Sequence, residues 1–246
     1  MKSAKKILAL AVSAMMLVSM TACGSGNGSA GGSADNNSAS GEAFKIGGIG
    51  PLTGGAAIYG TAAKNGAQIA VDEINAKGGV QFELNFQDDE HDAEKSVNAY
   101  NKLKDWGMQI LVGSVTTTPC VAVSQESNAD RIFTLTPSAS SNDVIGGQAD
   151  ADGNVTIPRK DNVFQMCFTD PNQGTKSAEY ISEKNLATKI AIIYNNSDAY
   201  STGIYTKFAA EAKELGLDVV SVTTFTDDTA NDFSVQLNEA KNKGAD

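Results

Sequence analysis

The segment FKIGGIGPLTGGAAIYG, residues 44–60, decides the fold of this 246-residue chain. Its apolar first part, Phe44–Ile49, predicts a buried strand, and the Gly, Pro and Thr residues after it predict a loop. Small and apolar residues then recur at helical spacing over Thr61–Ala76, and Lys77-Gly78-Gly79 ends that pattern. A strand, a loop and a helix in this order are typical of the first unit of an α/β sheet.

The same alternation of short apolar runs and helical patterns continues to residue 135. The next strands are expected at Phe82–Gln87, Ile110–Val112 and Ile132–Leu135. The helices between them are expected at Ala93–Trp106 and Pro119–Asn128. Because crossovers between parallel strands are right-handed, this order predicts a parallel sheet with helices on both faces.

A polar stretch rich in Gly and Asp, Ser141–Asp161, interrupts the alternation. Strands are expected after it at Val163–Phe168, Lys189–Tyr194 and Asp218–Phe225, and helices at Thr175–Asn185, Gly203–Leu215 and Asp232–Lys243. We interpret the interruption as the junction between two α/β lobes, residues 42–161 and 162–246; a long surface loop within one sheet is the simpler alternative. No strand follows the last helix, so we expect a fragment of a longer protein whose second lobe is incomplete.

The first 22 residues have the pattern of a bacterial signal peptide. Three lysines precede an apolar run, Ile7–Met20, which is shorter than the roughly 20 residues needed to cross a bilayer. The run ends in Met20-Thr21-Ala22-Cys23, which resembles the lipobox of bacterial lipoproteins. We therefore predict lipidation at Cys23; the alternative is an ordinary signal peptide that happens to contain a cysteine.

Residues 23–41 continue the pattern of a lipoprotein. Apart from Cys23 they are Gly, Ser, Ala and Asn with one charge, Asp35. Such a composition cannot bury enough apolar surface to fold, and it predicts a flexible tether. We therefore expect an exported protein that is lipid-anchored on the extracytoplasmic face of the cell membrane.

Charge and cysteine content exclude several classes of protein. The formal net charge is −10, from 19 basic and 29 acidic side chains, and loss of three leader lysines would leave 16 − 29 = −13. An acidic chain disfavours binding to nucleic acid. Beyond Cys23 the only cysteines are Cys120 and Cys167, both in apolar stretches. They predict buried free thiols rather than a disulfide framework or a metal site, and we expect no cofactor.

Loops rich in hydroxyl groups follow the predicted strands. They cover residues 50–60, 114–119, 136–141 and 195–200. Ligands of open parallel sheets bind at the carboxyl ends of the strands, so these loops predict the binding site. Thr118 before Pro119 is typical of a helix N-cap. The free N–H groups at the start of such a helix favour an anion such as a carboxylate. Tyr59 and Tyr200 would form flat walls for an apolar group; the alternative is that these hydroxyls only cap helices.

Enzyme active sites find less support in the sequence. His91, the only histidine, lies in the acidic run Asp88–Asp92, where we expect a solvated loop rather than a metal site or a general base. The glycines of residues 48–54 do not have dinucleotide-binding spacing. No nucleophile motif or phosphate-binding loop is present, and Cys120 has no evident base. We expect that the protein is not an enzyme.

In combination, several motifs resemble one known family. They are Gly50-Pro51-Leu52-Thr53-Gly54, Ile74–Val80, Thr136–Ser140, Asp170–Gly174 and Ser197–Gly203. The chain from Phe44 to Asp246 resembles the solute-binding proteins of branched-chain amino acid ABC importers. The resemblance implies the type I periplasmic-binding fold, in which two Rossmann-like lobes with parallel sheets close on a ligand. It implies a monomer that captures a branched-chain or other aliphatic amino acid for a membrane permease.

The resemblance also implies the ligand-binding residues. It assigns the ligand carboxylate to Thr117, Ser138 and Ser140, and the side-chain pocket to Tyr59 and Tyr200. Val115 and Ala139 would add apolar contacts, and Asp170 would contact the ligand ammonium group.

Three departures from the family pattern bear on the ligand. Relatives with a disulfide in the first lobe carry its cysteines at the positions of His91 and Thr116, and both are absent here. Ser138 stands where alanine is common, which favours a smaller or more polar ligand. The acidic residue that usually holds the ligand amine lies beyond Asp246. An amide or urea-type solute receptor and a ligand-sensing lipoprotein therefore stay open as alternatives; an exported hydrolase or dehydrogenase is disfavoured.

Overall fold

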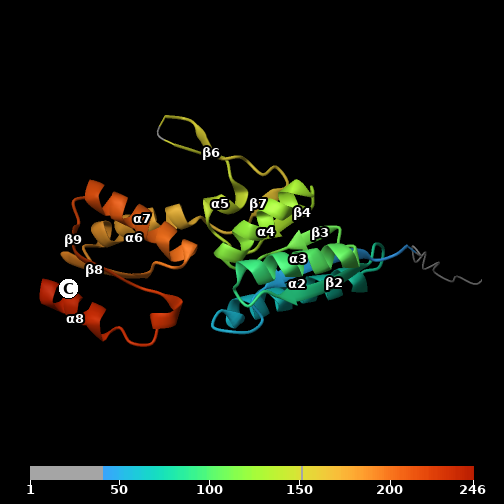
Figure 1. Ribbon diagram of the computed structural model, residues 1–246, viewed down its shortest axis with the longest axis horizontal. Coiled ribbons are helices and arrows are strands. Elements are labelled where there is room, and N and C mark those ends of the chain that lie inside the picture. The colour runs from blue at the N-terminus through green and yellow to red at the C-terminus, as the bar shows by residue number, and fades with distance from the viewer. Residues whose placement is uncertain (1–40, 151) are drawn as a thin grey trace, which may run out of the picture. The chain divides into compact units, whose positions relative to one another are not determined.

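The computed structural model describes residues 41–150 and 152–246 (Figure 1). The predicted signal peptide, Cys23 and all but the last residue of the predicted tether lie outside the described residues. Within the described part of the chain, no helix has the length and apolar character required to span a bilayer.

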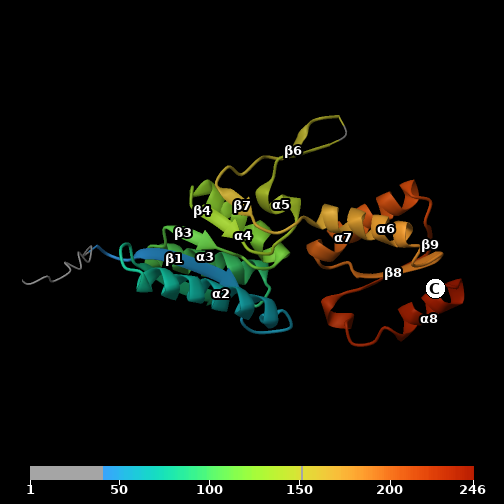
Figure 2. The same cartoon turned by 180° about the vertical axis from the view of Figure 1, so that it is seen from behind.

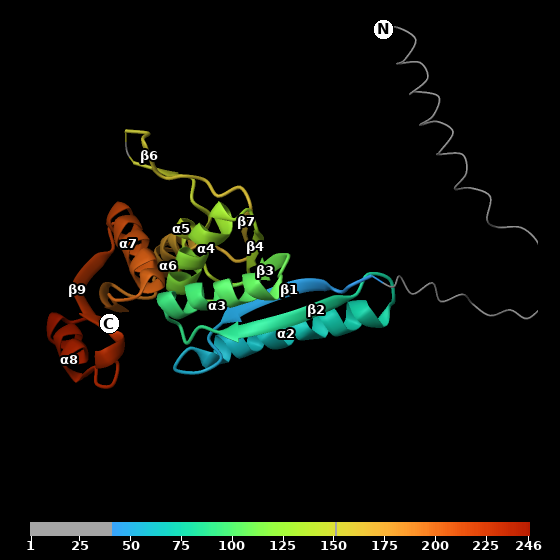
Figure 3. The same ribbon diagram turned by 45° about the vertical axis from the view of Figure 1, so that its right-hand side comes forward.

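The first sheet has five strands in the order β2-β1-β3-β4-β7. Its strands are β1 Phe44–Gly50, β2 Phe82–Asp88, β3 Ile110–Val112, β4 Phe133–Thr136 and β7 Val163–Gln165. Every neighbouring pair is parallel, which confirms the predicted parallel sheet. Figure 3 shows β1 and β2 side by side along α2.

Helices cover both faces of this sheet. They are α2 Ala57–Ala76, α3 Ala93–Trp106 and α4 Thr117–Ala129. Successive side chains of a strand point to opposite faces, so Leu111 and Val112 belong to different layers. Leu111 packs with Tyr100 and Leu103 of α3 in a buried cluster, whereas Val112 faces the apolar side of α2.

The strand predicted at Val163–Phe168 forms over Val163–Gln165 and pairs with β4. The prediction that it opens the second lobe is wrong. Val163, the first residue of β7, is fully buried with Cys120, Ala139 and Val144, which ties the strand to the first sheet. The polar stretch before it is a connection within that sheet, as in the simpler alternative. This connection contains α5 Asn142–Ile145 and the antiparallel strands β5 Gln148–Ala149 and β6 Val155–Ile157.

A second, two-stranded parallel sheet follows. It consists of β8 Lys189–Asn195 and β9 Asp218–Phe225, with helices α6 Asp170–Lys184, α7 Ala199–Glu214 and α8 Ser234–Lys243 and the short 3₁₀ helix η2 Asp227–Thr229. Figure 2 shows α6 and α7 side by side. They pack closely because Gly174 has no side chain: a Cβ there would lie 2.3 Å from the Ile204 carbonyl oxygen. Ala178, Ile190, Phe208 and Ala212 form the buried cluster beneath them.

Candidate functional site

A cavity of about 470 Å³ lies beyond the carboxyl ends of the strands. One wall comes from the loops after β1, β2, β3 and β4, and is formed by Ala56, Tyr59, His91, Val115, Thr116, Thr117, Ser138 and Ser140. The other wall comes from the segments after β7, β8 and β9, and is formed by Cys167, Phe168, Asn195, Asp198, Tyr200 and Asp227.

The structure brings six of the eight predicted ligand-binding residues to this cavity. They are Tyr59, Val115, Thr117, Ser138, Ser140 and Tyr200. Ala139 and Asp170 are buried beside it and do not line it. Contact of these eight residues with a ligand stays a prediction.

Helix α4 begins closer to β3 than the sequence indicates. Thr116 is its N-cap and Thr117 its first residue, so the prediction that Thr118 caps a helix starting at Pro119 is wrong. The Thr116 carbonyl accepts the Cys120 N–H at 3.1 Å and closes the first turn two residues earlier. Pro119 is tolerated there because the first four N–H groups of a helix have no partner within it. The N–H groups of Thr117 and Thr118 are therefore left to face an anion.

Hydrogen bonds join the loop after β3 to the loop after β4. The Ser138 hydroxyl donates to the Val115 carbonyl at 2.6 Å, and the Thr136 hydroxyl donates to the Ser114 carbonyl at 2.8 Å. The Ser140 N–H donates to Thr117 Oγ1 at 3.4 Å. The Ser138 hydroxyl proton is thus already engaged, so its backbone N–H is the donor it offers a ligand.

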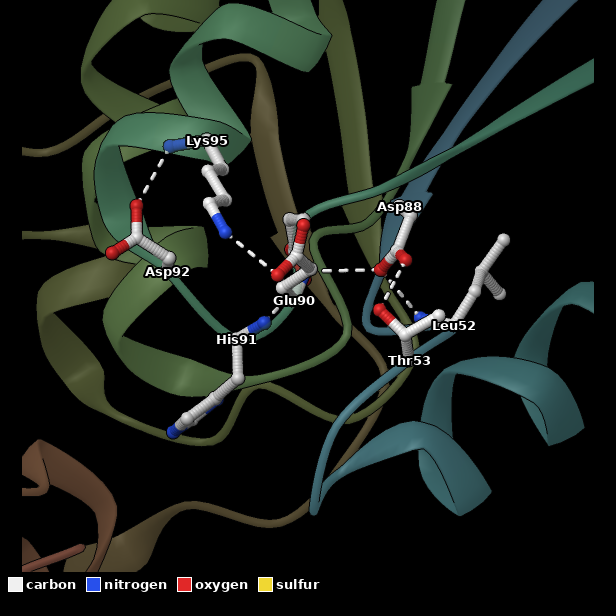
Figure 4. A network of polar contacts seen from close by, with 8 residues as sticks. Leu52, Thr53, Asp88, Glu90, His91, Asp92 and Lys95 are labelled. Carbon is white, nitrogen blue, oxygen red and sulfur yellow. Dashed lines mark hydrogen bonds and ion pairs between the residues drawn. The ribbon is translucent and has the colours of Figure 1, made fainter. Parts of the chain in front are cut away.

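Asp88, at the end of β2, holds the loop after β1 in place (Figure 4). Its Oδ1 accepts the N–H groups of Leu52 at 2.7 Å and Glu90 at 2.9 Å, and its Oδ2 accepts the Thr53 hydroxyl at 2.6 Å. Partial burial alone would raise the pKa of the Asp88 carboxyl. The hydrogen bonds together have the larger effect, so the pKa lies below its ordinary value. The ionised carboxylate therefore fixes the loop that leads to Tyr59.

Asp89 is fully buried beneath the cavity wall. Its carboxylate accepts hydrogen bonds from the Ser114 hydroxyl, from the Ser96 hydroxyl at 3.3 Å and from the His91 N–H at 3.0 Å. Burial raises the pKa of the Asp89 carboxyl. The hydrogen bonds have a smaller, opposite effect, so the pKa lies above its ordinary value. This one side chain connects the segments that follow β2 and β3.

His91 belongs to the cavity wall, which the sequence did not indicate. It is half-buried, and its Nδ1 lies 2.9 Å from Thr116 Oγ1. The expectation of a solvated loop is wrong for this side chain, although the described residues include no cluster of metal-binding side chains. The resemblance contained a signal for this contact. Relatives with the disulfide carry its cysteines at the positions of His91 and Thr116, and bonded cysteines must be adjacent in space.

The second wall carries the acidic groups. Asp198 caps α7, where its Oδ2 accepts the N–H and the hydroxyl of Ser201 at 2.9 and 2.8 Å. Asp227 Oδ1 accepts Asn195 Nδ2 at 2.6 Å. Asp227 was not among the predicted residues, although it lies two residues after the end of β9, at the carboxyl end of a strand like the predicted loops.

The two cysteines among the described residues are free thiols, as predicted, but the predicted burial holds only for Cys120. Cys120 is buried, whereas Cys167 is half-buried and lines the cavity. Burial raises the pKa of Cys120 to about 12, so this thiol is not a nucleophile at neutral pH.

Asp170 is buried at the start of α6, and neither carboxylate oxygen has a hydrogen-bond partner among the described residues. Its backbone N–H donates to the Ser140 carbonyl at 3.0 Å. Gly203 of α7 covers it: a Cβ at Gly203 would lie 3.0 Å from the Asp170 Cβ. Burial raises the pKa of the Asp170 carboxyl.

This raised pKa predicts a change of stability with pH. The folded protein holds the Asp170 proton more tightly than the unfolded chain does, so stability falls as pH rises from near 3.8 through the raised value. Asp170→Asn removes the buried charge and is expected to raise the unfolding temperature at neutral pH by about 2–4 °C. Thermal unfolding at acidic and neutral pH checks this, and the gain should vanish in acid. A variant less stable than wild type at neutral pH would contradict it.

Comparison of the sequence and fold with known proteins shows the family of this chain. The model of the periplasmic binding protein family matches residues 43–246. The chain belongs to this family. Among the relatives of this periplasmic binding protein are the Leu/Ile/Val-binding protein homolog 3 of Brucella melitensis biotype 1 (32% identical) and the Leu/Ile/Val-binding protein BraC3 of Rhizobium johnstonii (34% identical). Each alignment covers 82% of this chain and 52% of the relative. The chain thus spans about half the length of the curated relatives it matches.

Solved structures of periplasmic binding proteins share the fold. The substrate-binding protein LivJ of Streptococcus pneumoniae, in complex with isoleucine, superimposes with a TM-score of 0.72 at 29% identity over 83% of this chain and 56% of LivJ. The leucine-binding protein LivK of Thermotoga maritima gives 0.72 at 25% identity over 82% of this chain and 54% of LivK. The type I periplasmic-binding fold implied by the sequence resemblance is confirmed.

Proposed function

We propose that the complete protein is an extracytoplasmic solute-binding protein that captures an amino acid, branched-chain or otherwise aliphatic, for an ABC importer. The observation that carries this proposal is the distribution of charge around the cavity. One wall offers hydroxyl and N–H donors without a basic residue other than His91, and the other offers Asp198 and Asp227. A zwitterion has the complementary distribution. The names of the Leu/Ile/Val-binding relatives support the same class of ligand.

The ligand carboxylate is proposed to lie at the start of α4. Its partners there are the free N–H groups of the first helical turn and the side chains of Thr117 and Ser140, which are 4% and 3% exposed. Hydrogen bonds to an ionised acceptor are stronger than neutral ones, and they strengthen further when closure removes water. The aliphatic side chain would pack against Tyr59, Val115 and Tyr200.

The two walls are proposed to belong to two lobes that close by a hinge motion. We set the change of lobe after β7 rather than at residue 162, because β7 pairs with β4 of the first sheet. The lobes would trap the ligand, and no chemical reaction follows. We expect a monomer that is recognised by the membrane subunits of the importer.

The membrane anchor is proposed to be a lipid on Cys23, which keeps the capture domain beside its importer. Cys23→Ala is expected to move the protein from the membrane fraction to the soluble fraction without changing its ligand affinity. Fractionation of cells followed by calorimetry on the released protein checks both parts. A Cys23→Ala protein that stays in the membrane fraction would contradict the anchor.

Calorimetry on the complete mature protein tests the proposed ligand class. A panel of aliphatic amino acids, polar amino acids and small amides should include at least one amino acid that binds well below millimolar concentration. Binding of amides alone would instead favour the receptor for amide or urea-type solutes. Absence of binding by the whole panel would contradict the proposal.

A further inference from the structure

We propose that His91 is a further ligand-binding residue, which adds a side-chain N–H donor and, in its protonated form, a positive charge to the carboxylate subsite. This inference rests on the proposed function of the cavity. It concerns the one basic side chain on either wall: no lysine or arginine of the described residues lines the cavity. No role for this residue follows from the resemblance, because relatives with the disulfide carry cysteine at its position.

The backbone fixes where the imidazole points. Glu90 and His91 both have positive φ angles, 51° and 63°, which turn the chain sharply after β2. The His91 N–H is held by the buried Asp89 carboxylate at 3.0 Å. Figure 4 shows the ring extending away from the contacts of Asp88 with Leu52 and Thr53. The turn therefore presents the ring to the cavity instead of to the loop's own polar network.

Thr116 holds one ring nitrogen and leaves the other for the ligand. Its Oγ1 lies 2.9 Å from His91 Nδ1 and makes no capping bond to α4, although Thr116 is the N-cap. In the neutral tautomer whose proton sits on Nε2, the Thr116 hydroxyl donates to Nδ1. When the imidazole is protonated, Nδ1 donates to Oγ1 and the hydroxyl proton is released toward the cavity. Nε2–H is a donor in both states.

The acceptor for this donor is the ligand carboxylate. Thr116 is adjacent in sequence to Thr117, so a ring bonded to Thr116 lies beside the first turn of α4. The helix end, the Thr117 hydroxyl and His91 Nε2 then converge on one region of the cavity. An N–H group that loses water on closure must find an acceptor, and an ionised oxygen is the strongest acceptor that an amino acid offers.

The other charged groups near His91 are acidic or already paired. Asp89 lies beneath it on the same loop, and Asp92 caps α3 through the Lys95 N–H at 2.8 Å. Glu90 forms an ion pair with Lys95 at 2.6 Å, as Figure 4 shows. Across the cavity stand Asp198 and Asp227. A protonated His91 is thus the only cation that this wall can offer to a carboxylate.

Proton uptake on binding tests this role. A protonated imidazole binds a carboxylate more strongly than a neutral one does, so the wild-type protein should bind L-leucine, L-isoleucine or L-valine about tenfold more tightly near pH 5.5 than near pH 8. Calorimetry in buffers of different ionisation enthalpy should show a proton taken up near neutral pH. A purely structural role would not produce either signal.

One variant of His91 and a matched pair of variants at Thr116 separate the roles of the two ring nitrogens. His91→Asn tolerates positive φ and keeps a polar atom near Nδ1 for Thr116, but it has none at Nε2. It should stay folded, bind about tenfold more weakly near pH 5.5 and lose the pH dependence and the proton uptake. Thr116→Ser should retain both signals, whereas Thr116→Val should reduce them because the ring loses its anchor.

The outcomes distinguish this inference from the proposed function. Wild-type binding with the same pH dependence and proton uptake in His91→Asn would overturn the role of His91 and leave the proposed function standing. Wild-type protein that binds none of the three amino acids at either pH would overturn both.

Discussion

Replacing Thr117 by valine is expected to weaken amino-acid binding by about a hundredfold, because it removes a hydroxyl that faces an ionised carboxylate. Thr117 is 4% exposed and is the first residue of α4. Valine has nearly the same shape, so the cavity wall keeps its volume while it loses one polar partner. The Ser140 N–H loses only a long contact of 3.4 Å, and the fold should persist.

Thr118→Val is the matched control for this variant. Thr118 is the next residue of the same helical turn, but its side chain does not line the cavity. Its replacement should change the affinity by no more than about threefold. Calorimetry on both variants, with circular dichroism to confirm folding, gives the comparison. Equal losses for the two variants would show that the helix start, and not the Thr117 hydroxyl, determines binding.

Replacing Gly60 by alanine is expected to destabilise the first lobe by more than about 3 kcal/mol. Gly60 is buried in the first turn of α2, next to Tyr59. A Cβ at this position would lie 1.8 Å from the Pro51 carbonyl oxygen and 2.6 Å from its carbon. Backbone atoms cannot move aside as a flexible side chain can, so α2 or the loop after β1 must shift.

Gly66→Ala, on the same helix, supplies the control. A Cβ at Gly66 meets nothing within 4 Å, and alanine favours helix over glycine by about 0.5–1 kcal/mol. Urea unfolding should therefore show opposite signs for the two substitutions. A Gly60→Ala protein as stable as wild type would mean that α2 does not press on Pro51 as the structure indicates.

Local patterns were sufficient to predict the parallel sheet. Each of the strands β1, β2, β3 and β4, and each helix between them, has an apolar pattern within its own residues. The right-handed crossover rule then makes the strands parallel and puts helices on both faces of the sheet. Pairing of β7 was not predictable in this way. Its three residues carry no information about their partner strand, which is selected by burial of Val163 against Cys120 and Val144.

The parts of the candidate site that lie in loops after strands were predicted. The parts whose position depends on tertiary packing were not. The positions of the loops that carry Thr117 and Ser140 follow from the rule that ligands bind at the carboxyl ends of the strands, whereas the family resemblance implied these two residues within the loops. Asp170 was expected in the cavity but is covered by Gly203, because α6 begins five residues earlier than its apolar spacing indicates and meets α7. His91 was expected to be solvated because its neighbours in the sequence are acidic. The positive φ angles of Glu90 and His91, which turn the ring toward the cavity, could not be predicted from those neighbours.

A crystal structure of the complete mature protein with the amino acid that binds it most tightly would show directly how the ligand lies in the cavity. We expect the ligand carboxylate to lie at the start of α4, within hydrogen-bond distance of the Thr117 hydroxyl and a backbone N–H of that turn. The ligand ammonium group should point toward the wall that carries Asp198 and Asp227. A ligand bound outside this cavity, or one with its carboxylate on the acidic wall, would contradict the proposed function of the cavity.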